Sequence, residues 1–363
     1  MRRGPPAVLP AGSRLASWLR AGARSGPAPR LVLWTYAWRG YWFDRTWRQQ
    51  EALFRVPDFA GEGGRNLVFV LGFWRSGTTL LHELLASGPR MAAPRTWQCM
   101  NPSGFRIGGA PVSRAAVSRP MDAVSVSALS PQEDEFVLLA RGAPSVYRAW
   151  LDPRRWQETL PALRQETWLS LPEQEWLGDW RTFLGWCTPE GADTLVVKSP
   201  NHVFRLQALH RLWPKARVVW TLRDPADTWH SNRRMWQAMT AMYGLWSWPA
   251  GALDRLLFEA MSEYAAALRW AAATLGPDTM ACVDFERLSR SGAEVLRALT
   301  GRLDLGKWES WQPTVQPLLD ASAGHAPESY AQAAPLPPQA GALVEQVREL
   351  HARLAQHRGL NTP

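Results

Sequence analysis

Three short apolar runs each end in a cluster of polar residues. The runs cover residues 66–71, 194–197 and 216–222. Their length and their content of Val and Leu are typical of buried strands, and a helical stretch that reaches Leu212 separates the second run from the third. A strand, a helix and a strand at this spacing predict parallel pairing, which places the carboxyl ends of the strands at one edge of a sheet. We therefore predict an α/β fold in which the three polar clusters meet at that edge.

The polar cluster after the first run has the spacing of a phosphate-binding loop. Gly72 and Gly77 are separated by four residues, as the two glycines of a nucleotide P-loop are. In such a loop, backbone N–H groups and a helix N-terminus surround the phosphates. Thr78 stands where the P-loop has its lysine, whereas Arg75 and Ser76 add donors inside the loop. The pattern predicts an anion site that lacks the triphosphate lysine; an ordinary strand-to-helix turn is the alternative.

The two ends of the chain have patterns of their own. Residues 1–30 are rich in Arg, Pro, Gly and Ala and predict a loosely ordered basic arm. Residues 31–53 interleave aromatic residues with arginine, which predicts an amphipathic helix that either packs on the core or contacts a membrane surface or an acceptor lipid. After the prolines at 335–338, a further helix is predicted from Gly341 to Gln356. It could cover a nucleotide, pack as a terminal helix or mediate dimerisation.

These patterns divide the chain into three parts. We expect a basic, Arg- and Trp-rich arm and helix at residues 1–60, a single P-loop-like domain with helical insertions at 61–320, and a Pro-rich segment with a helix at 321–363. A chain of 363 residues with 46% hydrophobic residues can bury one large core.

Charge and cysteine content narrow the classes of partner. The net charge is +9 and only three residues are lysine, so the excess is almost entirely arginine. With abundant Ala and Pro, this bias is typical of a GC-rich genome rather than of a nucleic-acid-binding protein, although a basic surface still favours an anionic ligand or a membrane surface. Cys99, Cys187 and Cys282 are far apart and predict neither a disulfide framework nor a metal site. With no apolar run of about 20 residues and no signal-peptide core, a cytoplasmic protein is expected.

Taken together, the motifs resemble those of a known enzyme family. Residues 73–79, 197–202 and 222–231 are similar to the three nucleotide-binding motifs of sulfotransferases that use 3′-phosphoadenosine 5′-phosphosulfate (PAPS). The nearest branch is the bacterial one related to tyrosylprotein sulfotransferases. Further matches lie at 95–102, 130–136 and 283–288, so that the resemblance covers about residues 66–305. It implies a P-loop-type parallel sheet flanked by helices, and transfer of a sulfuryl group with release of 3′-phosphoadenosine 5′-phosphate (PAP).

The resemblance also implies roles for particular residues. Sulfuryl transfer is an in-line displacement in which positioned donors matter most, as in phosphoryl transfer. The residues that would hold the 5′-phosphosulfate are Arg75, Ser76, Gly77, Thr78 and Thr79, and Arg75 could also stabilise the sulfuryl oxygens. Lys198 would neutralise the leaving group, and Arg223 with Ser231 would bind the 3′-phosphate. No metal is expected.

Each role has a structural alternative. Lys198 could be a solvated charge at the end of a strand, and Arg223 could pair with Asp224 at a turn. His202 is a candidate catalytic residue, but it could equally cap or support a helix.

The general base is the weakest part of the resemblance. Related enzymes often have a glutamate where this chain has Gln98, which cannot take a proton. Glu133 is the candidate replacement, although Ser130, Pro131 and Glu133 also fit a helix start with a capping box. Asp134 and Glu135 are further candidates for the base. Phe285 is a second departure from the family pattern, because many relatives have tyrosine at this position.

The acceptor is poorly constrained by the sequence. The 22 tryptophans could line an apolar or sugar-stacking cleft, but most of them must belong to the core. A hydroxylated small molecule, a glycan or a lipid is expected as acceptor, with an amine as a variant, and the oligomeric state is left open. A P-loop kinase or NTPase and a catalytically inactive PAPS-binding module are the alternative functions.

Overall fold

The computed structural model describes residues 27–64, 66–111, 116–118, 125–164, 175–322 and 335–360. Most of the predicted basic arm and part of the C-terminal Pro-rich segment lie outside these residues. The chain forms two compact units, each built from several segments. The helical unit comprises Met1–Phe59, Pro94–Pro189 and Met235–Ala252, and the sheet unit comprises Ala60–Ala93, Glu190–Arg234 and Leu253–Pro363. The domain boundaries at residues 60 and 320 stay predictions.

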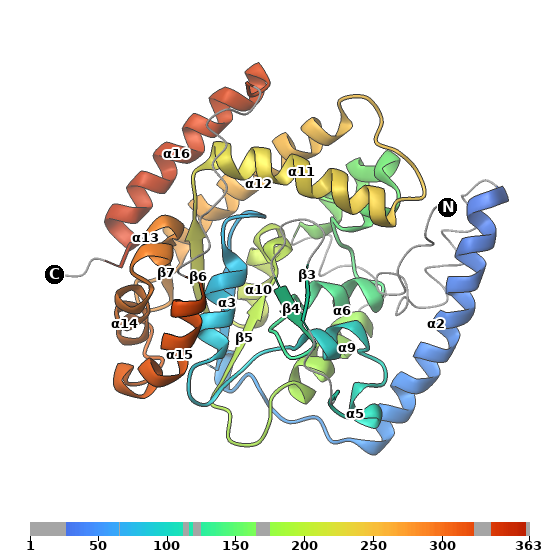
Figure 1. Cartoon of the computed structure of the whole chain (residues 1–363), viewed down its shortest axis with the longest axis horizontal. Coiled ribbons are helices and arrows are strands. Elements are labelled where there is room, and N and C mark those ends of the chain that lie inside the picture. Colours follow the sequence, from blue (N-terminus) through green and yellow to red (C-terminus); the bar gives the residue numbers. More distant parts are fainter. Residues whose placement is uncertain are drawn as a thin grey trace. The chain divides into compact units, whose positions relative to one another are not determined.

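A five-stranded parallel sheet forms the centre of the sheet unit (Figure 1). Its strand order is β2-β5-β1-β6-β7. The strands are β1 (Leu67–Leu71), β2 (Met91–Ala92), β5 (Thr194–Lys198), β6 (Arg217–Leu222) and β7 (Met280–Asp284). The three strands predicted from the apolar runs are therefore confirmed, and because β5, β1 and β6 are neighbours, their carboxyl ends lie side by side. The predicted α/β class is also confirmed.

Helices cover both faces of this sheet. Alternate residues of β1 point to opposite faces, and Val68 and Val70 join a buried cluster with Leu81 of α3 and Leu296 of α14. On the other face, the ring of Phe69 lies 5.6 Å from that of His202. The helices of this unit are α3 (Thr78–Ala86), α10 (Leu206–Leu212), α12 (Ala252–Thr274), α13 (Phe285–Arg290), α14 (Gly292–Arg302), α15 (Trp308–Ser322) and α16 (Pro338–Arg358), with 3₁₀ turns η1 (Glu62–Gly64) and η4 (Pro200–Arg205). Helix α11 (Pro225–Tyr243) starts in the sheet unit and ends in the helical unit.

The helical unit combines one long helix, α2, with several short ones. They are α2 (Pro27–Leu53), α4 (Thr96–Met100), α5 (Phe105–Gly108), α6 (Glu135–Ala140), α7 (Arg148–Leu151) and α9 (Glu175–Trp186), with 3₁₀ turns η2 (Pro153–Glu158) and η3 (Pro161–Leu163). Strands β3 (Ala116–Ser118) and β4 (Ser125–Ser127) pair antiparallel. The helices predicted at residues 31–53 and 341–356 are confirmed as α2 and α16. Across the part of the chain that the structure describes, we find no helix with the length and apolar character of a membrane span.

The structure decides between the two interpretations of Ser130 and Glu133. The alternative interpretation, a helix that starts at Ser130 with a capping box, is wrong, because α6 begins at Glu135 with Asp134 as its N-cap residue. The hydroxyl of Ser130 instead accepts a hydrogen bond from the N–H of Ser127. Pro131 forms a β-bridge with Arg95, which keeps this stretch extended. Glu133 is therefore not a capping residue, and its carboxylate instead accepts a hydrogen bond from the hydroxyl of Tyr147.

Candidate active site

Three backbone carbonyl groups in the loop between β1 and α3 each accept a hydrogen bond. The Phe73 carbonyl accepts from the N–H of Ser76 at 3.1 Å. The Trp74 carbonyl accepts from the Asn232 side chain at 2.8 Å, and the Arg75 carbonyl accepts from Arg223 Nη1 at 3.0 Å. These three hydrogen bonds fix the backbone of the loop. A loop that binds an anion through backbone N–H groups needs such a fixed backbone.

The two glycines of the loop are required by close packing. A Cβ at Gly77, where φ is 88°, would lie 2.1 Å from the ring of Phe285. A Cβ at Gly72 would lie 2.2 Å from the hydroxyl of Thr221. That hydroxyl contacts Ser76 Oγ at 2.7 Å, which fixes the loop against β6. Thr78 and Thr79 then form the first turn of α3, where unpaired N–H groups favour an anion.

The residues expected at the two ends of the nucleotide are joined to each other. Arg75 has a positive φ of 68°, an uncommon conformation for a residue other than glycine, and its Nε donates to Ser231 Oγ at 3.0 Å. The guanidinium of Arg223 lies over the ring of Phe285, 4.8 Å from its centroid. Phe285 thus supports both the loop and Arg223 through its ring, although it lacks the hydroxyl of tyrosine.

Lys198 lies at the carboxyl end of β5 and is 2% exposed. In the register of the sheet it pairs with Val70, two residues before the loop begins. The cluster that follows it is tied to the loop, because Asn201 Oδ1 accepts from Trp74 Nε1 at 3.0 Å. A buried ammonium at this position can act on an anion in the loop, since charge interactions are screened less away from water.

His202 belongs to the same cluster but points into the protein. Its side chain is fully buried and its ring packs edge-on against Phe69 in β1. This position under the sheet favours the structural role that the sequence left open.

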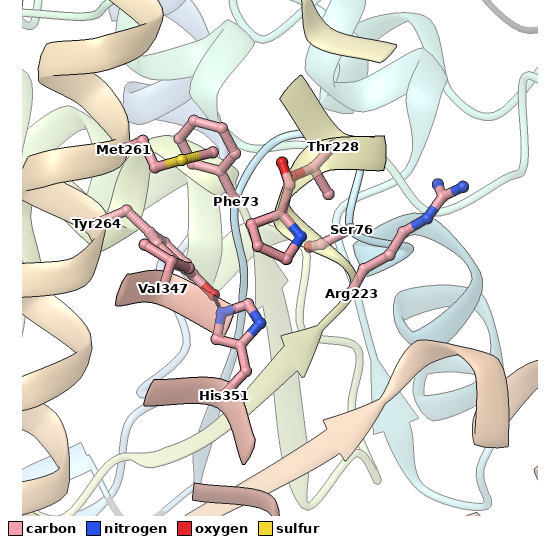
Figure 2. A pocket seen from close by; sticks show the side chains of 9 residues that line it. Phe73, Ser76, Arg223, Thr228, Met261, Tyr264, Val347 and His351 are labelled. Carbon is pink, nitrogen blue, oxygen red and sulfur yellow. Dashed lines mark hydrogen bonds between the residues drawn. The ribbon is translucent and has the colours of Figure 1, made fainter. Parts of the chain in front are cut away.

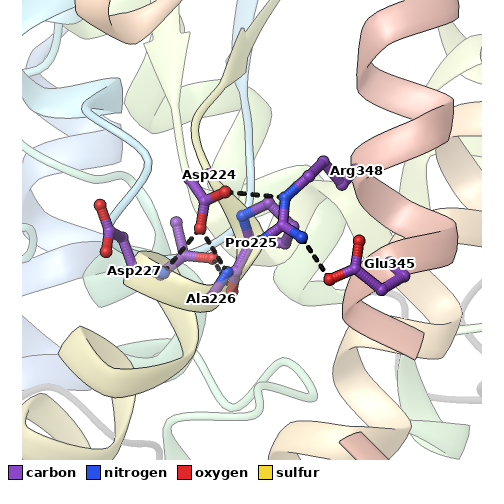
Figure 3. Close-up of polar contacts among 7 residues, drawn as sticks. Asp224, Pro225, Ala226, Asp227, Glu345 and Arg348 are labelled. Atoms are coloured by element: carbon purple, nitrogen blue, oxygen red, sulfur yellow. Dashed lines mark hydrogen bonds and ion pairs between the residues drawn. The ribbon is translucent and has the colours of Figure 1, made fainter. Parts of the chain in front are cut away.

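Helix α16 contributes contacts that sequence reasoning missed (Figure 3). Arg348 Nε donates to Asp224 Oδ2 at 3.0 Å, and the other oxygen of Asp224 accepts from the N–H groups of Ala226 and Asp227 at the start of α11. Burial would raise the pKa of Asp224, but the hydrogen bond from Arg348 and those from the two N–H groups outweigh it and hold the pKa below its ordinary value. The turn that carries Arg223 is therefore fixed by the C-terminal helix.

A small pocket lies beside this turn (Figure 2). His351 of α16 contacts the hydroxyl of Tyr264 at 2.8 Å, and it also bonds to the backbone of Arg223. Burial lowers the pKa of His351 to about 4, although the charge of Asp224 and the bond to Arg223 oppose this shift. His351 is thus neutral at neutral pH. The lining residues are Phe73, Ser76, Arg223, Pro225, Thr228, Met261, Tyr264, Val347 and His351.

The candidate bases lie in the helical unit. Glu133 accepts a hydrogen bond from the hydroxyl of Tyr147 at 2.8 Å and is partly exposed. Asp134 is fully buried and accepts from Trp180 at 2.7 Å, which makes it a structural residue. Gln98 accepts from the N–H of Arg95 at 2.7 Å and completes a capping box for α4. Of these residues, Glu133 has both the exposure and the carboxylate that a base needs.

Comparison with known proteins identifies the family. The model of the sulfotransferase family matches residues 67–310, which include the loop, Lys198, Arg223 and Ser231. The chain belongs to this sulfotransferase family. Among curated proteins, it is 29% identical over 267 residues to the omega-hydroxy-beta-dihydromenaquinone-9 sulfotransferase Stf3 of Mycobacterium bovis, which covers 72% of this chain and 69% of the relative. The same values hold for Stf3 of Mycobacterium tuberculosis.

Solved structures agree with the fold of this sulfotransferase. Sulfotransferase STF9 from Mycobacterium avium superposes with a TM-score of 0.63 at 18% identity, over 94% of this chain and 91% of that one. Sulfotransferase STF1 from Mycobacterium tuberculosis gives a TM-score of 0.56 at 19% identity, over 95% and 88%. At this level of identity the likeness concerns the fold. Helix α16, which fixes the Arg223 turn, lies beyond the residues that the family model matches.

Proposed function

We propose that this sulfotransferase moves the sulfuryl group of PAPS to a hydroxyl or amine of its acceptor and releases PAP. The observation that carries the proposal is the linkage of Arg75, Ser231 and Arg223: Arg75 donates to Ser231, and its own carbonyl accepts from Arg223. This linkage joins an anion-binding loop to a second cationic position, as a donor with a 5′-phosphosulfate and a separate 3′-phosphate requires. Two fixed anion sites also bind a sulfuryl donor with two anionic groups more selectively than a single anion site does.

The loop and Lys198 act on the charge that develops during transfer. The acceptor oxygen forms a bond to sulfur while the bond between sulfur and the bridging oxygen breaks, so that the electron pair of that bond goes to PAP. The N–H groups of the loop and the first turn of α3 hold the 5′-phosphate. Lys198 stabilises the bridging oxygen as it becomes negative, and Arg75 stabilises the sulfuryl oxygens. Donors that are fixed before the reaction need no reorganisation when this charge appears.

Glu133 is the proposed general base. Its carboxylate takes the proton from the acceptor hydroxyl, and the hydrogen bond from Tyr147 holds it in one orientation. Proton removal by a positioned carboxylate contributes about 10²–10⁴-fold to the rate of such reactions. His202, in contrast, is assigned a supporting role because its ring packs against Phe69.

A hydroxylated lipid is the proposed class of acceptor. The name of the mycobacterial relative Stf3 describes a sulfotransferase of an omega-hydroxylated dihydromenaquinone. Among the glycan, small-molecule and lipid acceptors that the sequence allowed, that relative supports a lipid with a terminal hydroxyl.

A thermal-shift experiment with two nucleotides tests the donor. A ligand at about 100 times its dissociation constant adds roughly 2.7 kcal/mol to the stability of the folded state, which is readily measured. We expect PAP to stabilise the protein, and ATP with magnesium to have little effect. Stabilisation by ATP with magnesium alone would favour a kinase or NTPase instead. If PAP binds, incubation with labelled PAPS and a long-chain omega-hydroxylated quinone or alcohol should yield a sulfated product; PAP binding without turnover of any acceptor would indicate an inactive module.

A further inference from the structure

Helix α2 carries a patch of exposed aromatic residues on one side. Trp38, Tyr41 and Trp42 are 66%, 47% and 50% exposed. Positions i, i+3 and i+4 share one side of a helix, and the three rings contact one another, with centroids 5.5 Å apart for Tyr41 and Trp42 and 6.2 Å apart for Trp38 and Trp42. Exposed Trp and Tyr residues gathered in this way are uncommon on a soluble surface and indicate an interaction site.

The opposite side of α2 is fixed to the rest of the helical unit. Trp47 is 1% exposed, with its ring 4.5 Å from the guanidinium of Arg141. Gln50 is fully buried, donates to the carbonyl of Pro102 and accepts from the N–H of Arg106. These contacts determine the rotation of the helix about its axis. The aromatic patch therefore cannot turn inward without breaking them.

The exposed charges around the patch are mainly positive. Between residues 38 and 49, the exposed charged side chains are those of Arg39, Arg45 and Arg48. The acidic residue of this stretch, Asp44, pairs with Arg141 at 3.0 Å. Glu51, one turn after Arg48, is the nearest exposed acidic residue on this helix, so arginine remains in excess. The outward face therefore combines amphipathic aromatic rings with an excess of positive charge, which is the chemistry that binds lipid head groups and phosphates at a membrane surface.

We propose that the outward face of α2, formed by Trp38, Arg39, Tyr41, Trp42, Arg45 and Arg48, docks the enzyme on the surface of a bilayer that contains anionic lipids. The helix lies in the plane of the interface, with its rings at head-group level and its arginines on lipid phosphates. This inference goes beyond the proposed transfer reaction and does not depend on it, because docking needs neither nucleotide nor acceptor. It would place the enzyme at the surface where a lipid acceptor resides.

Co-sedimentation with vesicles tests the docking in the absence of nucleotide. The full chain is mixed with vesicles of phosphatidylcholine alone and with vesicles that contain roughly 30% phosphatidylglycerol, an anionic lipid. We expect binding to the anionic vesicles that is at least about tenfold stronger and that weakens as salt is raised from about 0.05 M to about 0.5 M. The variant W38A/Y41A/W42A and the variant R39S/R45S/R48S should each lose at least about tenfold of this binding.

A matched control distinguishes the effect of the outward face of α2 on vesicle binding from the effect of the net charge of the protein. The variant R290S/R297S/R353S removes three exposed arginines from other helices and should retain most of the binding. Circular dichroism shows whether each variant is folded. If the aromatic triple variant is unfolded, the vesicle binding of the single variant Trp38→Ser and of the arginine variant tests the proposal instead. Binding that survives both α2 substitutions, or that falls equally in the control, would overturn the proposal. So would a wild-type dimer that the aromatic variant converts to a monomer, because the patch would then be an interface between two copies.

Discussion

Arg75 Nε donates a hydrogen bond to Ser231 Oγ at 3.0 Å, which joins the β1–α3 loop to helix α11. The sequence assigned these two residues to opposite ends of the nucleotide. Because Arg223 also donates to the Arg75 carbonyl, the loop and the turn that carries Arg223 are linked. Under the proposed function, an anion bound at one of them should therefore help to order the other.

Arg223→Ala should weaken PAP binding by about 1.5–3 kcal/mol, the usual contribution of a hydrogen bond to a charged group. The affinity for adenosine 5′-monophosphate, which lacks the 3′-phosphate, should change much less. Isothermal titration calorimetry with both nucleotides measures the difference. Equal losses for the two nucleotides would remove Arg223 from the 3′-phosphate site.

Lys198→Ala should lower kcat far more than it weakens PAP binding, because the proposed role of the ammonium is to stabilise charge that appears only as the bond to sulfur breaks. Steady-state kinetics and PAP titration of the same preparation give the two quantities. The exposed Lys215, which pairs with Glu62 at the surface, supplies the control substitution to Ala. A Lys198 variant in which affinity and turnover fall together would contradict the leaving-group role.

Glu133→Gln should reduce kcat by about 10²-fold or more, since the amide cannot accept the acceptor's proton. It should leave PAP affinity intact, because Glu133 is assigned to the acceptor and not to the nucleotide. Gln98→Glu should leave the rate unchanged, because this side chain is engaged with the N–H of Arg95 at the start of α4. A faster Gln98→Glu enzyme with a normal Glu133→Gln enzyme would assign the base to position 98.

Arg348→Ala should weaken PAP binding about threefold to tenfold, as expected from a half-exposed ion pair, through loosening of the Asp224 turn that carries Arg223. Arg353→Ala, on the same helix and paired with Glu349, is the matched control and should have no effect. A double-mutant cycle with Arg223→Ala supplies the specific readout, since the effect of Arg348→Ala should vanish once Arg223 is absent. Additive losses would mean that Arg348 acts independently of Arg223.

His351 should make the stability depend on pH in the acid range. Its pKa in the folded protein, about 4, is below that of an unfolded histidine, about 6.5. The unfolded state therefore binds more protons between these values, so stability is fully present above pH 6.5 and falls as the pH drops toward 4, by up to about 3 kcal/mol. Urea unfolding of wild type and His351→Gln across this range should show a shallower slope in the variant. The exposed His357 on the same helix gives the control, His357→Gln, which should keep the wild-type slope.

The local sequence pattern was sufficient to predict the three strands and to place most of the polar residues at their ends. The runs that became β1, β5 and β6 are mostly apolar because both faces of a parallel sheet are covered, and the polar residues after them could only lie at the carboxyl edge. The spacing of Gly72 and Gly77 likewise predicted the loop, because a positive φ and close packing at such a turn favour glycine. The identity of the fold was therefore accessible from the sequence alone.

The local sequence pattern was not sufficient where a side chain has a hydrogen-bond partner that the pattern does not show. Ser130 and Glu133 fit a capping box, yet the Ser130 hydroxyl bonds to Ser127 and the helix starts later. The sequence already excluded Gln98 as the base, but its contact with the backbone of Arg95 became visible only in the structure.

The sequence by itself predicted the three central strands, the loop and the candidate donors, because each depends on spacing within one short segment. Only the tertiary structure decided which of these residues contact one another: Arg75 with Ser231, Arg348 with Asp224, and Phe285 with Gly77 and Arg223. These pairs lie far apart along the chain, and packing alone brings them together. The orientation of α2 was decided in the same way, since burial of Trp47 and Gln50 leaves Trp38 and its neighbours facing outward. A periodic pattern indicates that a helix has two faces, and the contacts of one face fix the direction of the other.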